Sequence, residues 1–248
     1  MASTHTAEPM PADPALIDDL VAANRILYNE GVVDGFGHVS VRHDKSQERF
    51  LLARSMAPGL VTAADIMQFG LDGEPIEPGS TPYLERFIHS EIYKVQPAVQ
   101  AIVHSHSPAV IPFGVAAGAA LRPIYHMSSF LGAGVPVFEI REAGGPATDM
   151  LIRNPALGAA LAKALGGAAV GLLRGHGNVV VGGSLREVVF RAVYTEVNAR
   201  LQADALRLGQ GEVLFLNDQE AQQATETNRG QHGRPWELWK ARALGIAQ

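Results

Sequence analysis

The segment Ala101-Ile-Val-His104-Ser-His106-Ser-Pro108 joins a short apolar run to two histidines that are two residues apart. An apolar run of this length, which begins at Val99, is typical of a buried strand. Side chains alternate between the two faces of a strand, so His104 and His106 should lie on one face. Two imidazoles on one face can bind a single metal ion at the strand end. The alternative is a chance spacing, in which one histidine packs in the core and the other caps a turn.

A third histidine lies in the turn Gly175-His176-Gly177, between the apolar runs 169–174 and 178–181, which we predict to be two strands. Glycines on both sides let the backbone adopt a positive φ and let a bulky group approach closely. A histidine held in such a turn suits a third metal ligand. The alternative is a simple hairpin with an exposed histidine.

A carboxylate lies on the helix predicted from Pro82 to Lys94, where Glu85 and His89 are four residues apart and so share one face. The alternative is a solvent-exposed helical pair.

Taken together, these three places favour a catalytic metal site. Three neutral imidazoles leave a divalent metal with open coordination positions, as in catalytic rather than structural sites. Such a metal acts as a Lewis acid on a carbonyl, enolate or phenolate oxygen, and a nearby carboxylate supplies acid–base catalysis. We therefore predict His104, His106 and His176 as the metal ligands and Glu85 as the acid–base group.

The rest of the chain alternates helical and strand patterns. Helical spacing predicts helices from Pro14 to Gly31, over 155–165 and from Ser184 to about Leu208, the last with a capping box between Ser184 and Glu187. Further strands are expected at 38–42, 50–54, 67–71 and 136–140, and a helix start at Thr62. The pattern predicts a flexible start over residues 1–12 and one domain over 13–248 with a helical C-terminal tail. His5, His43 and His232 are expected at the surface.

Composition excludes several classes of protein. The 248 residues are 47% hydrophobic and 18% charged, which is typical of a globular chain, and the net charge of −5 provides no footprint for nucleic acid or an anionic membrane. There is no cysteine, so any metal must bind histidine or carboxylate. The first residues do not resemble a signal peptide, and the apolar stretch Val110–Leu121 is too short to span a bilayer, so we expect a cytoplasmic protein.

Several of these segments together resemble the class II aldolase/adducin family, over roughly Pro14 to Gly209. They are the run Gly37-His38-Val-Ser-Val-Arg, the segment 50–73, Glu85 with the helix after it, the two-histidine strand and the Gly-His-Gly turn. The resemblance implies an α/β fold of three layers, α/β/α, around a central mixed, mainly antiparallel sheet. It also implies one divalent metal ion per subunit and a homotetramer with active sites between subunits. The apolar stretch Val110–Leu121 is a candidate for the buried contact between subunits. Adducin-like members lose the metal histidines, whereas this chain keeps all three.

The chain differs from the family members that act on sugar phosphates at the positions that bind the phosphate group. His38 stands at the usual asparagine, Met56 at a usual glycine, and Tyr83 and Leu84 at two usual serines, so Ser55 alone remains as a phosphate donor. A planar carboxylated substrate suits the altered pocket better, because a guanidinium such as that of Arg54 binds a carboxylate through two hydrogen bonds. We predict substrate contacts at His38, Arg54, Ser55, Tyr83 and His126. An ordinary surface ion pair is the alternative for Arg54.

The segments FGHVSVRH, LARSMAPGLVTAADIM, LERFIHSEIY, VHSHSP and VFRAVYTEVNARLQ resemble one branch, the hydroxy-aromatic dicarboxylate decarboxylases. This branch includes the hydroxy-methylpyridine-dicarboxylate and dihydroxyphthalate decarboxylases. The resemblance implies a metal-dependent carbon–carbon lyase that decarboxylates an ortho-hydroxy aromatic dicarboxylate in aromatic or vitamin catabolism. Glu85 would protonate the ring carbon, which requires a raised pKa that partial burial supplies. Manganese or zinc is expected, with iron and cobalt as alternatives, because imidazole binds them all.

Three other functions remain open. The first is a class II aldolase that acts on a non-phosphorylated hydroxy acid or aldehyde. The second is a non-haem iron oxygenase of the same family. The third is a non-catalytic, adducin-like interaction module, against which the intact Glu85 and metal histidines argue.

Overall fold

A seven-stranded mixed sheet forms the centre of the protein in the computed structural model, which describes residues 10–246. The strand order is β3-β2-β1-β4-β7-β6-β5, and every neighbouring pair is antiparallel except β5 with β6. The strands are β1 His38–His43, β2 Ser46–Ala53, β3 Ile66–Gly70, β4 Ala101–Ser105, β5 Val137–Phe138, β6 Val170–Leu173 and β7 Gly177–Gly182. The predicted mixed, mainly antiparallel sheet is therefore confirmed.

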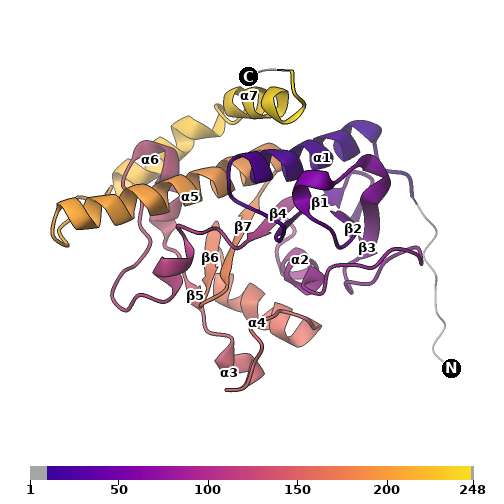
Figure 1. Cartoon of the computed structure of the whole chain (residues 1–248), viewed down its shortest axis with the longest axis horizontal. Coiled ribbons are helices and arrows are strands. Elements are labelled where there is room, and N and C mark those ends of the chain that lie inside the picture. Colours follow the sequence, from indigo (N-terminus) through magenta and orange to yellow (C-terminus); the bar gives the residue numbers. More distant parts are fainter. Residues whose placement is uncertain (1–9, 247–248) are drawn as a thin grey trace.

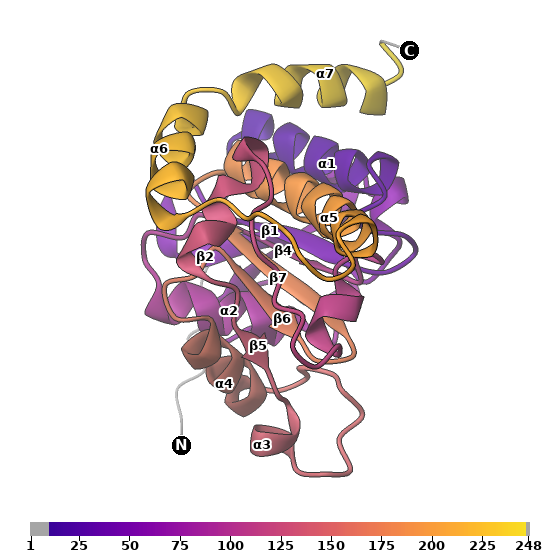
Figure 2. The same cartoon turned by 90° about the vertical axis from the view of Figure 1, so that its left-hand side faces the viewer.

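Helices cover both faces of this sheet (Figure 1). The α-helices are α1 Pro14–Asn29, α2 Arg86–Val95, α3 Arg141–Gly144, α4 Pro155–Leu165, α5 Leu185–Leu208, α6 Asp218–Arg229 and α7 Gly233–Ala243. Short 3-10 helices are η1 Pro58–Leu60, η2 Ala63–Asp65, η3 Ile111–Gly114 and η4 His126–Ala133. Figure 2 shows α1 and α5 over one face of the sheet and α2 and α4 under the other. The predicted three-layer α/β/α fold is confirmed.

Two hydrophobic cores fill the spaces between the layers. Side chains of β4 alternate between the two cores, because Val103 packs toward the α1 and α5 side while Ile102 packs toward α2 and α4. His104, two residues after Ile102, therefore belongs to the α2 side of the sheet. The C-terminal helix α7 extends the first core, in which its Trp236 and Trp239 are buried.

The long helix α5 begins as predicted, but its cap differs. The Ser184 hydroxyl accepts a hydrogen bond from the Glu187 amide at 3.2 Å, as an N-cap does. The Glu187 carboxylate does not complete a capping box with Ser184, because it accepts from the Gly183 amide at 2.6 Å instead.

Several local predictions were wrong. The helix expected from Pro82 begins at Arg86, and the expected strand 136–140 has only two residues. His43 is buried rather than at the surface, and its Nε2 lies 2.9 Å from the carbonyl oxygen of Met10, a partner that is distant in sequence. His232 is half-buried, with its ring 4.5 Å from the ring of Phe190. His5 lies outside the described residues.

The apolar stretch Val110–Leu121 divides between core and surface. Val110, Phe113 and Leu121 pack in the chain's own core, whereas Val115 is exposed. Across residues 10–246, the helices are each too short or too polar to cross a bilayer.

Candidate metal centre

Strand pairing brings the three predicted metal ligands to one end of the sheet. His104 lies on β4, directly opposite His38 of β1, and His106 follows two residues later, just beyond the strand end. On the other side of β4, the turn that leads into β7 carries His176 after Gly175, whose φ is +66°. Gly177 is required here, since a Cβ at this position would lie 2.1 Å from the Ser105 carbonyl oxygen. The close approach of this turn to β4 sets His176 beside the other two histidines.

The side chains converge as the sequence predicts. The Nε2 atoms of His106 and His176 are 2.9 Å apart, and Oε2 of Glu85 lies 3.5 Å from the Nε2 atoms of both His104 and His176. One ligand atom from each of the four residues lies within 4.8 Å of all the others.

The protonation of His104 suits a metal ligand. Its Nδ1 lies 3.1 Å from the Asn178 carbonyl oxygen, which can only accept, so Nδ1 carries a proton, and Nε2 is the nitrogen left to bind a metal. Among the described residues, this buried Nε2 has no hydrogen-bond partner. Buried polar atoms are nearly always paired, and a buried imidazole nitrogen that lacks a donor is one that a cation can satisfy. Three imidazoles and a carboxylate at these distances therefore fit a divalent metal ion.

The electrostatics of the cluster correct one expectation. Burial raises the pKa of Glu85, but the positive charge and hydrogen bonds that His104 and His176 offer when they are protonated outweigh it and bring that pKa well below its usual range. The predicted raised pKa is therefore wrong, because burial acts here against two ring nitrogens that lie 3.5 Å from the carboxylate. Burial, with His104 and His176 nearby, also lowers the pKa of His106 to about 4, so that ring is neutral near neutral pH.

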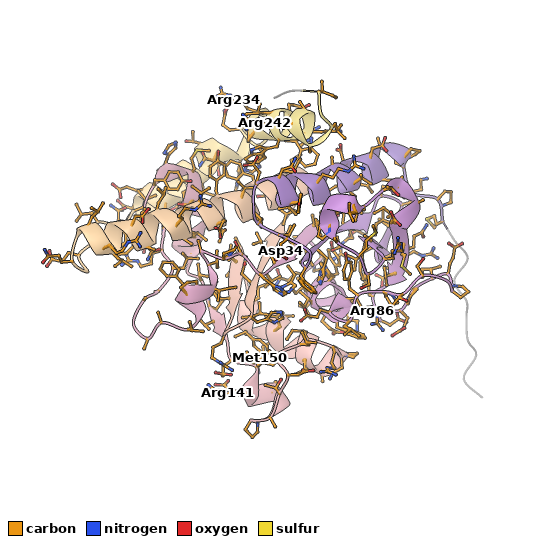
Figure 3. All side chains as sticks on the ribbon, viewed as in Figure 1. Asp34, Arg86, Arg141, Met150, Arg234 and Arg242 are labelled. Carbon is orange, nitrogen blue, oxygen red and sulfur yellow. The ribbon has the colours of Figure 1, made fainter. Side chains whose placement is uncertain are left out.

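Glu85 is held from the other side by a strained segment. Its Oε1 accepts a hydrogen bond from the Ile152 amide at 2.9 Å, which turns Oε2 toward the histidines. Two residues earlier Met150 has a φ of 74°, a conformation that non-glycine residues adopt rarely and often near functional sites. Met150 is labelled between the sheet and α3 in the view of Figure 3, and its sulfur accepts a hydrogen bond from Arg174 at 3.6 Å.

A cavity of about 360 Å³ opens beside the cluster. Of the predicted substrate-binding residues, His38, Ser55 and Tyr83 line it, together with Glu85, His104 and His106. The remaining lining is Gly35, Phe36, Gly37, Met56, Ala57, Leu84 and Leu151, and none of the lining residues is arginine or lysine. The cavity therefore combines a polar end at the metal ligands with mainly apolar walls.

Two predicted substrate residues lie apart from this cavity. Arg54 pairs through its Nε with Asp65 at 2.7 Å, on a side chain that is 41% exposed, which is the surface ion pair considered as its alternative. His126 is exposed at the start of η4, where its backbone carbonyl accepts from Asn228. Neither side chain is among those that surround the cavity in this single chain.

Sequence reasoning missed several residues of the site. Phe36, Leu84 and Leu151 line the cavity, Ile152 fixes Glu85, and Asn178 orients His104. The signal for Phe36 was its place between two glycines immediately before His38. Nothing in the local sequence indicates the Ile152 contact, since it joins residues 67 positions apart.

The chain belongs to the class II aldolase and adducin N-terminal domain family, whose profile matches residues 18–203. It is 39% identical over 241 residues to the decarboxylase tropJ of Talaromyces stipitatus, covering 88% of this chain and 90% of that protein. It is 35% identical over 202 residues to a 3,4-dihydroxyphthalate decarboxylase of Terrabacter, covering 75% of this chain and 80% of that protein. The fold matches the L-fuculose 1-phosphate aldolase of Glaciozyma antarctica with a TM-score of 0.75, at 24% identity over 98% of each chain.

The predicted family is thus confirmed, and so is the likeness to its decarboxylase branch. The family and the decarboxylase relatives support a lyase, and the four-residue cluster could hold the divalent metal that such a lyase uses.

Proposed function

We propose that this protein is a metal-dependent carboxy-lyase that removes CO₂ from an ortho-hydroxy aromatic carboxylate, most simply a dicarboxylate. The observation that carries the proposal is the pairing of an intact metal-ligand cluster with an apolar cavity that lacks a phosphate cradle. The decarboxylase relatives, which align over most of this chain, support the same reaction.

The walls of the cavity fit a flat ring. Phe36 is 69% exposed and Leu84 is 62% exposed, so both present apolar surface to a ligand in the cavity rather than to the core. Tyr83 donates its hydroxyl proton to the Met56 carbonyl at 2.5 Å, which holds its ring in place. An aromatic substrate that lies against these side chains would bury its faces and keep its oxygens at the polar end.

A metal held by His104, His106 and His176 would supply positive charge that stabilises negative charge on the substrate's oxygens. Glu85 in its carboxylate form is suited first to accept the proton of the substrate's hydroxyl group. The bond from the ring to the carboxylate then breaks, CO₂ leaves and the electron pair stays on the ring carbon. Glu85 returns its proton to that carbon, and the product's oxygen regains a proton from water.

Further features of the family are proposed for this chain. His38, Ser55 and Tyr83 would contact the substrate directly. Arg54 and His126 would contribute only if the assembly brings them to a cavity, and we propose a homotetramer with its sites between subunits. Manganese or zinc is the proposed metal.

The decisive experiment is a screen for CO₂ release over ortho-hydroxy aromatic mono- and dicarboxylates, including 3,4-dihydroxyphthalate, with each metal ion added back in turn. In heavy water, the product should carry deuterium on the carbon that lost CO₂. Release of an aldehyde from hydroxy acids, with no CO₂ from any aromatic acid, would show an aldolase instead.

A further inference from the structure

A continuous line of buried polar groups runs from the cavity into the protein between β1 and α2. His38 Nδ1 lies 2.6 Å from His89 Nε2, and His89 Nδ1 lies 2.6 Å from the Ser40 hydroxyl. The Ser40 hydroxyl in turn lies 2.9 Å from the Tyr93 hydroxyl. All four side chains are at most 4% exposed.

The two elements supply these groups through their own periodicities. His38 and Ser40 are two residues apart on β1, and His89 and Tyr93 are four residues apart on α2, so each pair shares one face. The pairs interleave where the helix packs on the sheet. An apolar interface would serve packing equally well, so four polar groups in series here call for another explanation.

The distances show which group donates each hydrogen bond along this line. The Tyr93 hydroxyl has one proton and two neighbouring acceptors, Ser40 at 2.9 Å and the Gln100 carbonyl at 3.5 Å. The longer distance lies outside the normal range for a hydroxyl donor, so Tyr93 donates to Ser40. Ser40 must then donate its single proton to Nδ1 of His89.

The same logic continues through both imidazoles. A neutral histidine that accepts at Nδ1 carries its proton on Nε2, so His89 donates from Nε2 to Nδ1 of His38. His38 then accepts at Nδ1 and carries its own proton on Nε2. This nitrogen is the polar atom that His38 can still offer to the cavity, which it lines beside Tyr83 and His104, with ring centroids at 4.6 Å and 5.1 Å.

We propose that Tyr93, Ser40 and His89 are positioning residues that fix His38 as a neutral donor, with its Nε2–H directed to a carboxylate oxygen of the substrate. This role rests on the proposed function, because only that function places a carboxylate group on the substrate. A donor in that place distinguishes carboxylated substrates from analogues that present a donor of their own there. Burial, with His104 nearby, lowers the pKa of His89 to about 3, and burial, with His89 and His104 nearby, lowers that of His38, in keeping with two neutral rings.

The tautomer can be measured without substrate. Long-range proton–nitrogen correlation spectra of the full-length protein, with isotope-labelled histidine and loaded with diamagnetic Zn²⁺, distinguish the two neutral forms of each ring. The His38→Gln and His89→Gln variants assign the signals. We expect the proton of both rings on Nε2. A His38 ring with its proton on Nδ1 would overturn the proposal, whether or not the protein releases CO₂ from any acid.

A pair of variants tests the consequence for binding. His89→Gln keeps an N–H that can donate to His38, whereas His89→Leu has none. With 2-hydroxybenzoate as the probe and calorimetry as the measurement, His89→Leu should raise the dissociation constant about tenfold, which is the worth of a hydrogen bond to a charged group. His89→Gln should restore most of this affinity.

His43→Leu is the matched control, since His43 is a buried histidine of the same strand that bonds instead near Met10. The dissociation constant of the His43→Leu variant for 2-hydroxybenzoate should equal that of the wild type. Equal affinity in His89→Leu and His89→Gln would contradict the donor role, because only the first removes the donor.

Discussion

Two buried polar clusters lie at opposite ends of β1, on the side of the sheet that α2 covers. At one end His38 adjoins the metal-ligand cluster, and at the other Arg42 is only 4% exposed. Both clusters take charged or titratable groups out of water, which is costly unless those groups find partners. The clusters differ in how completely their hydrogen bonds are made.

The Arg42 cluster is closed. Its Nε donates to the Val99 carbonyl at 3.0 Å, Nη1 to that of Gln47 at 2.6 Å, and Nη2 to those of Tyr93 and Gln96 at 2.8 and 3.3 Å. The guanidinium also lies 4.5 Å from the centre of the Tyr93 ring. These bonds join β1 to the end of α2 and to the segment before β4, so Arg42 acts as a structural cross-link.

The histidine cluster is open. Nε2 of His104 has no hydrogen-bond partner among residues 10–246, and the Nε2 atoms of His106 and His176 lie 2.9 Å apart, a pair that a single proton or a shared cation can bridge. Burial alone therefore does not separate a functional polar cluster from a structural one. A functional cluster is recognised instead by polar atoms that converge on one point and lack hydrogen-bond partners there.

The largest expected effect comes from removing one ligand of the open cluster. His104→Ala should lose turnover completely and reduce the bound metal, measured by elemental analysis, to near zero. Added Zn²⁺ should raise the melting temperature of the wild type, since a ligand at 100 times its dissociation constant adds about 2.7 kcal/mol, and should not raise that of the variant. His43→Ala is the control and should keep its metal. A His104→Ala protein with stoichiometric metal would refute this ligand set.

The next effect separates Glu85 from the metal ligands. Glu85→Gln should keep the fold and the metal, because an amide oxygen can still accept from the Ile152 amide. Turnover should fall by about 10²–10⁴-fold, the usual worth of a positioned acid–base group, while substrate affinity changes much less. Steady-state kinetics with metal analysis on the same sample measures both. Near-normal turnover would assign proton delivery to another group, with His38 and His126 the next candidates.

The closed cluster should respond in the opposite way. Arg42→Met removes the donors to four carbonyl groups, two of them in fully buried hydrogen bonds, so the free energy of unfolding should fall by about 3 kcal/mol in a denaturant titration. Metal content and turnover per folded molecule should stay close to those of the wild type. Arg207→Met is the control, because Arg207 is exposed and pairs with Asp204 on the surface, where ion pairs contribute little. Loss of metal in Arg42→Met would show that the two clusters are coupled along β1.

The sequence was most informative where a regular period carries the signal. The strand at His104, the Gly-His176-Gly turn and the long helix α5 were predicted closely, because alternation, paired glycines and a serine cap are local features. Contacts between distant segments were not predictable in this way. The Ile152 amide on Glu85 and the His38–His89 bond depend on how a loop and a helix pack on the sheet. The burial of His43 was missed for the same reason, since Met10 becomes its partner only in the folded chain.

The smallest expected effect concerns the apolar wall of the open cluster. Phe36 is 69% exposed and its ring lies 6.1 Å from that of His106, so in the free protein it covers little of the core. If it lies against the substrate's ring, Phe36→Ala should raise KM for an aromatic acid about fivefold, since an aromatic contact contributes about 1 kcal/mol, with kcat and metal content nearly unchanged. Leu60→Ala is the matched control, because Leu60 is 70% exposed and lies outside the residues that line the cavity. A loss of stability in Phe36→Ala without a change in KM would make Phe36 a packing residue and would leave Tyr83 and Leu84 to contact the ring.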